Sequence, residues 1–409
     1  MLLGIANADK KRLSVFIQFE LKKRMRQDPD YTVDEFVSGI CSKTKFKLLV
    51  QNKELFDSDI YEFFLRKLGY EFNYDDKIIS RALADKRDLL QLLEKQNMPA
   101  FYQGLQKYLK DMESVKEYAL ESIEYECFNW ILDVELNTNA FSALLVRFKM
   151  LDDYGQEICG YFLLKYIHDH IADRIDEKWL DRYGLKNLKA LQNQFWILKL
   201  LIQWEAYYDA SIYCQNVLDQ AYKRKNDRLF FHTQITRLFI VMKIQPSAFE
   251  HYANQVLENP IIQEDREDDY VYEFYHVVGL HYFIEKNYEQ AWHYFRRAMN
   301  DELYYFPEII FLNHMATITS MKLPEELKEQ IQVPQDQKIY QPIYRYFCLK
   351  NKKESYDTLE TYLWDNCCKG LDRFYPSWVM KDIIQTEFEW IASQTGDKKY
   401  LNRFLEENK

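Results

Sequence analysis

Hydrophobic residues recur every three or four positions along most of this chain, and short polar breaks separate the periodic stretches. In residues 10–26 this spacing places Leu13, Phe16, Ile17, Leu21 and Met25 along one side of a helix. From about residue 75 to residue 400 the pattern continues as a run of amphipathic segments. Such spacing is typical of helices that bury one face, so we expect an all-α protein.

Capping residues mark two short helices near the start of the chain. Thr32 followed by Glu35 forms the pattern of a capping box, which predicts a helix over residues 33–37 that ends at a Ser-Gly pair. Ser42 is a second N-cap and predicts a helix through about residue 49. Asn52 follows that helix, and asparagine tolerates the left-handed backbone found at many helix ends.

A further helix is expected over residues 59–68, with Asp57 or Ser58 as its cap and Gly69 at its end. Two short helices joined by a tight turn, with a longer helix on either side, are the plan of a helix-turn-helix DNA-binding domain. We therefore assign residues 1–70 to such a domain, which we call the head.

The stretch from residue 32 to residue 53, TVDEFVSGICSKTKFKLLVQNK, carries a more specific signal. It resembles the helix-turn-helix of phage-repressor-type (XRE) regulators, in particular the short-turn variant of RNPP-type peptide-sensing regulators. Phe36 stands where that family usually has leucine, Val37 stands at its packed alanine, and Ile40-Cys41-Ser42 match its turn. Phe46 and Leu49 fall on the core positions of the recognition helix.

The stretch departs from the family pattern at both ends. Val33 replaces the usual polar residue after the cap, and Val50-Gln51-Asn52 replaces the usual Glu-x-Gly. One phosphate-contacting side chain is therefore missing. The resemblance still implies DNA contacts from the caps and the start and exposed side of the third helix, at Thr32, Ser42, Lys43, Thr44, Lys45 and Lys47. The alternative is a solvated lysine face on a small docking domain.

We call the part of the chain that follows the head the body. Its clearest unit is residues 271–300, which have the pattern of a helical hairpin of the tetratricopeptide (TPR) type. Six residues occupy successive signature positions of that repeat: Tyr275, Gly279, Tyr282, Ala291, Phe295 and Ala298. Asn287 and Tyr288 fall in the turn. Gly279 and Ala291 are small where the two helices of the hairpin would cross.

Weaker repeats follow the same phase. Ala210 and Ala248 are 38 residues apart, and Ala248 and Ala291 are 43 apart, so the period is about 40 residues. Residues 338–366 and 376–405 read as two further helix pairs, and residues 116–172 as one or two. We expect a TPR-like α-solenoid over residues 116–409 and a helical linker over residues 71–115.

In such a solenoid the first helix of each hairpin lines the concave surface. Counting offsets from the small residues gives the predicted peptide-binding positions Gln192, Phe195, Lys199, Thr233, Arg237, Glu273, His276 and Phe283. Apolar positions mixed with single polar ones suit an extended peptide, and Lys199 and Arg237, at one shared offset, would hold its carboxylate. The alternative is that these are ordinary, partly exposed solenoid residues.

Composition and charge fit this organisation. Only 10 Gly and 9 Pro among 409 residues disfavour turn-rich β-folds, and 47% hydrophobic residues disfavour disorder. The net charge of −10 is uneven, because residues 1–70 carry 13 basic and 10 acidic side chains and the rest is acidic. Phosphate groups attract a basic head and repel an acidic body.

Several other chemistries are not expected. The seven cysteines lack C-x-x-C spacing, which favours buried thiols in a reducing compartment. His168 and His170 stand two apart on a helix, so they face different ways and we expect no metal site. Phosphate-binding glycine loops and hydrolase motifs are absent, and we expect no cofactor and no enzyme activity. Charges at residues 9–12 and the lack of an 18-residue apolar run argue against a signal peptide or membrane span and favour the cytoplasm.

The resemblance to RNPP-type regulators implies a homodimeric transcription factor that binds double-stranded DNA. Its body would bind a short signalling peptide that switches DNA binding, as in quorum sensing. A dimer surface is expected near the aromatic-rich end, at Phe374, Tyr375, Trp378, Phe388 and Trp390. The alternative is a TPR-type interaction adaptor whose degenerate head, with Val33 and Val50, does not bind DNA.

Overall fold

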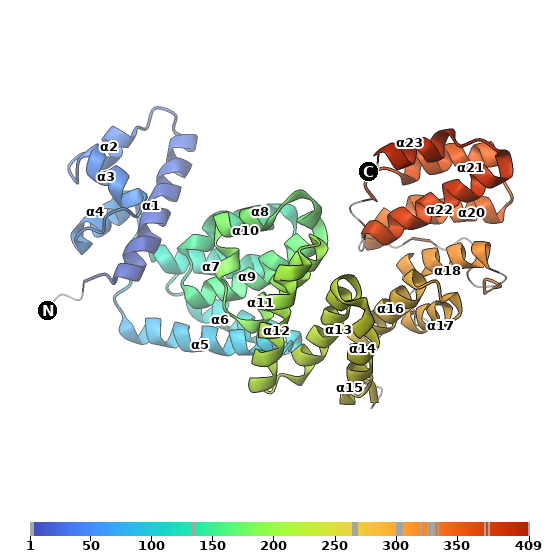
Figure 1. Ribbon diagram of the computed structural model, residues 1–409. Helices are drawn as coiled ribbons and strands as arrows, with labels where there is room; N and C mark the ends of the chain where they lie inside the picture. The colour runs from blue at the N-terminus through green and yellow to red at the C-terminus, as the bar shows by residue number, and fades with distance from the viewer. Residues whose placement is uncertain are drawn as a thin grey trace. The chain divides into compact units, whose positions relative to one another are not determined.

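The computed structural model describes residues 4–132, 136–263, 269–299, 306–319, 321–324, 327, 332, 333, 335–371, 374 and 377–407. Helices dominate these residues and no β-strand occurs among them, so the all-α prediction is confirmed (Figure 1). The chain divides into two compact units, which are described one at a time. The first unit is Met1–Leu201 with Gln215–Leu229, and the second is Ile202–Cys214 with Phe230–Lys409.

Twelve α-helices are described up to Lys223, among residues 4–132 and 136–223, and the last of them contributes residues to both units. They are α1 (Asn7–Gln27), α2 (Val33–Val37), α3 (Lys43–Val50), α4 (Ser58–Leu68), α5 (Asp76–Glu94), α6 (Met98–Met112), α7 (Ala119–Leu132), α8 (Thr138–Arg147), α9 (Asp153–Tyr166), α10 (Glu177–Tyr183), α11 (Leu191–Gln203) and α12 (Tyr207–Lys223). The predicted linker, residues 71–115, contains the whole of α5 and α6 and is part of the first compact unit.

In the head, α3 and α4 pack against α1, and α2 packs against α3 (Figure 1). Phe36, Phe46 and Phe64, one from each of these three short helices, form an aromatic core with ring centroids 5.0 to 5.6 Å apart. The predicted stripe of α1 is buried from Leu13 to Leu21, but Met25 in the last turns is 36% exposed and lies outside the core. Three packed rings at this spacing fix how α2 and α3 cross.

The predicted caps of α2 and α3 are present. Thr32 Oγ1 accepts from the Glu35 amide at 3.3 Å, and Glu35 Oε2 accepts from the Thr32 amide at 3.0 Å, which completes the capping box. Ser42 Oγ accepts from the Lys45 amide at 3.2 Å. Asn52 has a φ of 53°, in the left-handed region as expected.

The start of α4 differs from the prediction. Asp57 is the N-cap residue, but its side chain makes no capping hydrogen bond. Ser58 Oγ instead accepts from the Ile5 amide at 2.9 Å, so it ties the N-terminal segment to α4. Gly69 ends the helix with a φ of 86°, as predicted.

A buried ammonium group joins three helices of the first unit. Lys86 on α5 is 3% exposed, and its Nζ lies 2.7 Å from Glu124 Oε2 on α7. The same Nζ donates to Asp152, whose other oxygen caps α9 by accepting from the Gly155 amide at 2.7 Å. Tyr108 on α6 donates its hydroxyl hydrogen to Glu124. Burial alone lowers the pKa of Lys86, but Glu124 and Asp152 outweigh it and the pKa is raised.

The described helices of the later part of the chain follow α12. They are α13 (Asp227–Ile244), α14 (Phe249–Leu257), α15 (Pro260–Gln263), α16 (Asp269–Ile284), α17 (Tyr288–Ala298), α18 (Phe306–Ile318), α20 (Gln341–Asn351), α21 (Tyr356–Tyr362), α22 (Ser377–Thr395) and α23 (Lys399–Glu407). In the second unit, successive members of the group α20 to α23 pack against one another.

Helices α16 and α17 form the hairpin expected from residues 271–300, and they are closely packed. A Cβ atom on Gly279 would lie 2.8 Å from Cδ1 of Phe295, closer than carbon atoms approach. Ala291 and Ala298 are fully buried on the facing side of α17. Small residues at these positions therefore allow the two helices to come together.

The turn of this hairpin occurs at three places in the described chain. Lys286 adopts a left-handed φ of 59°, the Asn287 amide bonds the Tyr282 carbonyl at 2.9 Å, and Asn287 Oδ1 then caps α17. The pairs Gln96-Asn97 and Lys225-Asn226 do the same between α5 and α6 and between α12 and α13. One asparagine thus ends one helix and begins the next.

Ala248 does not take the buried helix position that the repeat pattern predicts for it. Ala248 lies half-buried in a 3₁₀ turn before α14, and the next residue, Phe249, takes the buried position at 1% exposure. Ala253 is the small buried residue within α14. By contrast, Ala210 is fully buried in α12, as predicted.

We predict that Gly279→Ala destabilises the second unit by about 1–3 kcal/mol through overpacking against Phe295. Helix propensity alone would make the same change stabilising by up to about 1 kcal/mol. A decrease in the free energy of unfolding would therefore indicate the close contact between residue 279 and Phe295. Urea unfolding and hydrogen exchange of α16 and α17 measure the effect. Adding Phe295→Leu is expected to recover part of the loss, and a stabilising single substitution would contradict the close approach.

We predict that Lys86→Met destabilises the first unit by about 3–5 kcal/mol, because Glu124 and Asp152 are left buried without a cation. The exposed Lys77→Met on the same helix is the control, with a change below about 0.5 kcal/mol. Burial raises the pKa of Asp152, but Lys86 and Arg12 outweigh it and lower the pKa. The stabilisation is therefore present above about pH 4 and lost as Asp152 is protonated below it, a dependence that the Met variant is expected to lack.

Candidate nucleic-acid interface and ligand-binding residues

Helix α3 presents most of the predicted DNA-contacting residues to solvent. Ser42, Lys43, Thr44 and Lys47 are exposed, while Phe46 and Leu49 on the opposite side are buried in the head. Lys45 is half-buried, with its Nζ 4.8 Å from the centre of the Phe56 ring. The packing of α3 therefore separates a core side from a polar side that carries three lysines.

The turn between α2 and α3 is fixed by side chains from other helices. Gly39 takes a left-handed φ of 80°, which allows the chain to reverse after α2. Lys67 of α4 donates from its Nζ to the carbonyls of Glu35 and Ser38, at 2.5 and 3.4 Å. Arg24 of α1 donates to the Lys67 carbonyl at 3.0 Å. These contacts hold the end of α2 and hence the start of α3.

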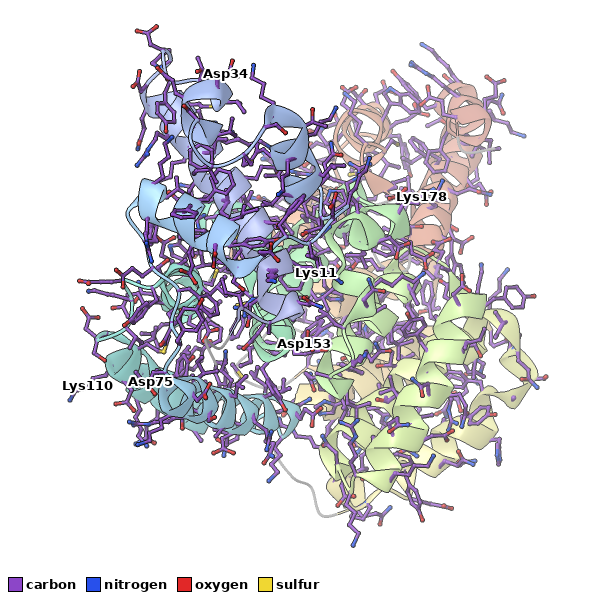
Figure 2. The ribbon with its side chains drawn as sticks, turned by 90° about the vertical axis from the view of Figure 1, so that its left-hand side faces the viewer. Lys11, Asp34, Asp75, Lys110, Asp153 and Lys178 are labelled. Carbon is purple, nitrogen blue, oxygen red and sulfur yellow. The ribbon has the colours of Figure 1, made fainter. Side chains whose placement is uncertain are left out.

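The charges next to α3 are mixed. Lys43 Nζ lies 2.5 Å from Asp34 Oδ2 on α2, and both side chains are more than half exposed. Figure 2 shows Asp34 at the outer end of the head. An exposed ion pair of this kind contributes little to stability, so an incoming phosphate competes with it at small cost. The Thr32 hydroxyl is already used within its capping box.

The predicted peptide-binding residues of the first unit are mostly internal. Gln192 and Phe195 are buried, and Gln192 Oε1 accepts from Gln96 Nε2 at 3.5 Å. Lys199 is half-buried, with its Nζ about 6 Å from the ring centres of Phe195 and Trp196. The structure gives Gln192 and Phe195 a packing role, which the offset rule did not anticipate.

In the second unit, Thr233 and Phe283 are also buried rather than groove-facing. The Phe283 ring packs 5.2 Å from the ring of Phe311. His276 Nδ1 lies 2.5 Å from Oε1 of the buried Glu308. Burial lowers the pKa of this imidazole, but Glu308 outweighs it and the pKa is raised, which favours a buried ion pair. Glu273 is half-buried on the same helix as His276.

Arg237 on α13 is the predicted ligand residue with the most distinctive surroundings. Its guanidinium carbon lies 4.0 Å from the centre of the Tyr252 ring, and Nη2 donates to Gln255 Oε1 at 3.0 Å. Its Nε is buried and finds no hydrogen-bond partner in the described part of the chain, and burial lowers the pKa of the side chain. No carboxylate among the described residues pairs with it. Arg237 is thus half-buried and packs against α14.

Tyr252 and Gln255 of α14 were not singled out from the sequence. They lie three residues apart and so share one side of α14. This spacing predicts that both residues contact the same neighbouring helix, but the sequence does not tell which helix that is. Lys199 belongs to the first unit and Arg237 to the second. Their predicted convergence on one peptide carboxylate stays a prediction.

The aromatic residues proposed for a dimer surface are largely internal. Phe374 and Phe388 are buried, and Trp378 and Trp390 are half-buried. The ammonium of Lys350 lies 3.8 Å from the centre of the Trp390 ring. Tyr375 lies outside the described residues. Packing within the second unit therefore accounts for Phe374 and Phe388.

The thiols and histidines offer little reactive chemistry. The cysteine thiols are unpaired, and burial raises their pKa values, to about 12 for Cys214 and Cys368. His168 Nδ1 contacts Asp169 at 2.8 Å within a π-helical turn. In the described part of the chain, no three His, Cys, Asp or Glu side chains are grouped as metal ligands. Within the same residues, no helix has both the length and the apolar character of a membrane span.

Comparison of the chain with protein-family models, curated proteins and solved structures finds no match.

Proposed function

We propose that this protein is a DNA-binding regulator that uses α2 and α3 as a helix-turn-helix. The observation that carries the proposal is the two-sided packing of α3, whose inner residues join the aromatic core while Ser42, Lys43, Thr44 and Lys47 face solvent. The major groove of DNA is wide enough for such a helix, and in helix-turn-helix domains the helix that follows the tight turn binds there. Lysines contact phosphates or guanine edges there.

The rest of the proposal concerns the body, which we infer to be TPR-like and to bind a short peptide that switches DNA binding in a homodimer. The α16–α17 hairpin supports the TPR-like part, because small residues lie where its helices cross and asparagine turns recur. Arg237 supports the peptide part, because its charge has no carboxylate partner in the described chain and a peptide C-terminus would supply one. Two heads would read two half-sites of a palindrome.

A second function is favoured by the charges on α2. Asp34 pairs with Lys43 and, with Glu35, places two carboxylates in the first turn of α2, where a DNA-binding domain of this type meets phosphate. Under this alternative the protein is an interaction adaptor whose head docks on protein.

We predict that Lys43→Ala/Lys45→Ala/Lys47→Ala abolishes salt-sensitive binding to duplex DNA without changing helical content. Each phosphate contact removed lowers the slope of log K against log salt by about 0.9. Fluorescence anisotropy with a labelled duplex pool across a salt series measures affinity and slope, and circular dichroism measures helicity.

The matched control is Lys77→Ala/Lys107→Ala/Lys110→Ala, which removes the same charge from exposed sites on α5 and α6. Lys110 projects into solvent well away from Asp34 in Figure 2. Equal losses in the two triple variants would indicate non-specific attraction only. Absence of salt-sensitive DNA binding by the wild-type chain would favour the adaptor.

We predict that Arg237→Ala weakens the binding of a peptide selected from a library with free C-termini by roughly ten- to hundredfold. Isothermal calorimetry measures the affinities. An amidated form of the peptide lacks the carboxylate and is expected to bind both proteins alike. Because Arg237 packs on Tyr252, we also expect a lower unfolding temperature in the variant, so binding is measured well below it. Equal affinities for the free-acid peptide would place its carboxylate elsewhere.

A further inference from the structure

A cavity of about 170 Å³ lies in the first unit, between the head and the helices that follow it. Its walls come from α1, from the connection between α4 and α5, and from α5, α6 and α7. Neither the DNA-binding surface of α3 nor any predicted peptide-binding residue lines it.

The connection between α4 and α5, which closes one side of the cavity, is held in place by hydrogen bonds. The Glu71 carbonyl accepts from the Ala119 amide at 3.0 Å, which ties the chain to the start of α7. Asn73 is 2% exposed, and its Nδ2 donates to Glu121 Oε1 at 3.0 Å. Asn73 Oδ1 also accepts from the Asp75 amide at 2.9 Å, just before α5 begins. The cavity is therefore part of the folded unit.

The apolar side of the cavity is incompletely packed. Ile78, Ile79, Ala82 and Leu83 on α5 line it, and all four are only half-buried. The first fully buried residue of this helix is Lys86. A second cavity of about 110 Å³ shares Ile78, Ala82 and Met112 with the first. An apolar molecule in this space would gain contacts that the protein itself does not provide.

The polar side of the cavity carries excess negative charge. Lys86 is shared by two carboxylates, Glu124 and Asp152, and Arg12 is paired with Asp9 at 2.9 Å. Glu121 Oε1 accepts from the Asn73 amide at 3.0 Å, and Glu121 forms no ion pair within 4 Å among the described residues. Four carboxylates against two cations leave a formal charge of −2 on the lining. Burial raises the pKa of Glu121 by more than the Asn73 amide and the nearby Arg12 lower it.

We propose that this cavity binds a small amphiphilic cation, with an ammonium group at Glu121 and an apolar body against α5. Cavities of about 150 Å³ accept benzene, so the ligand has about six to eight non-hydrogen atoms. An anion would add to the excess negative charge of the lining, and a neutral molecule would leave that excess uncompensated. The site is independent of the DNA-binding proposal.

Three probes of nearly equal shape test the charge requirement: benzylamine, benzyl alcohol and benzoate, titrated into the full chain by calorimetry and followed by protein NMR. Saturable binding of benzylamine is expected, with benzyl alcohol at least tenfold weaker and benzoate not bound. Glu121→Gln keeps the shape and removes the charge, and is expected to weaken benzylamine about ten- to hundredfold. Glu117→Gln, an exposed carboxylate outside the lining, is the matched control and is expected to leave affinity unchanged.

A second variant tests the location independently. Ala82→Leu places a larger side chain in the cavity and is expected to abolish benzylamine binding while circular dichroism shows an unchanged helical content. The proposal is overturned if benzylamine shows no saturable binding at millimolar concentration, or if amine and alcohol bind equally. It is also overturned if a folded Glu121→Gln or Ala82→Leu protein binds benzylamine as the wild type does.

Discussion

The first unit depends on one buried cation, because a lysine ammonium cannot leave water without compensation. Lys86 meets Glu124 and Asp152, which come from two other helices, and Asp152 at the same time caps α9. Amphipathic helices bury apolar faces in many alternative registers at similar free energy. A register that separated Lys86 from Glu124 and Asp152 would leave a charge buried without a partner, which adds a penalty that apolar faces alone do not impose.

The second unit uses the same principle with the charge reversed. Glu387 on α22 is 1% exposed, and it is approached by His314 of α18 at 2.8 Å, by the Tyr346 hydroxyl at 2.8 Å and by Lys350, both of α20. Burial raises the pKa of this carboxyl group, but His314 and Lys350 outweigh it and lower the pKa. Each unit therefore has a buried ionic cluster that joins three helices.

Sequence predicts the head better than the body because the signals of the head are local. A capping box, an N-cap serine and a left-handed glycine act within a few residues, so Thr32, Ser42 and Gly69 could be read directly. Lys86, Glu124 and Asp152 look like surface charges in sequence, and only the tertiary structure brings them together. The predicted groove residues were found by assuming that every repeat has the same length. That assumption fails at Ala248, where the buried position is shifted by one residue, and the predicted residues Phe195, Thr233 and Phe283 are buried.

Under the proposed function, the distribution of charge constrains how the head can work. The basic excess of the head is small and the rest of the chain is acidic, so general attraction to DNA is weak. Lys43 is also engaged by Asp34 before any DNA arrives. Affinity must then come from correctly placed base-edge contacts and from joining two heads, because a second head binds at the high local concentration set by the first. The aromatic core and Lys67 consequently matter alongside the lysines, because they set the angle at which α3 of each head meets its half-site.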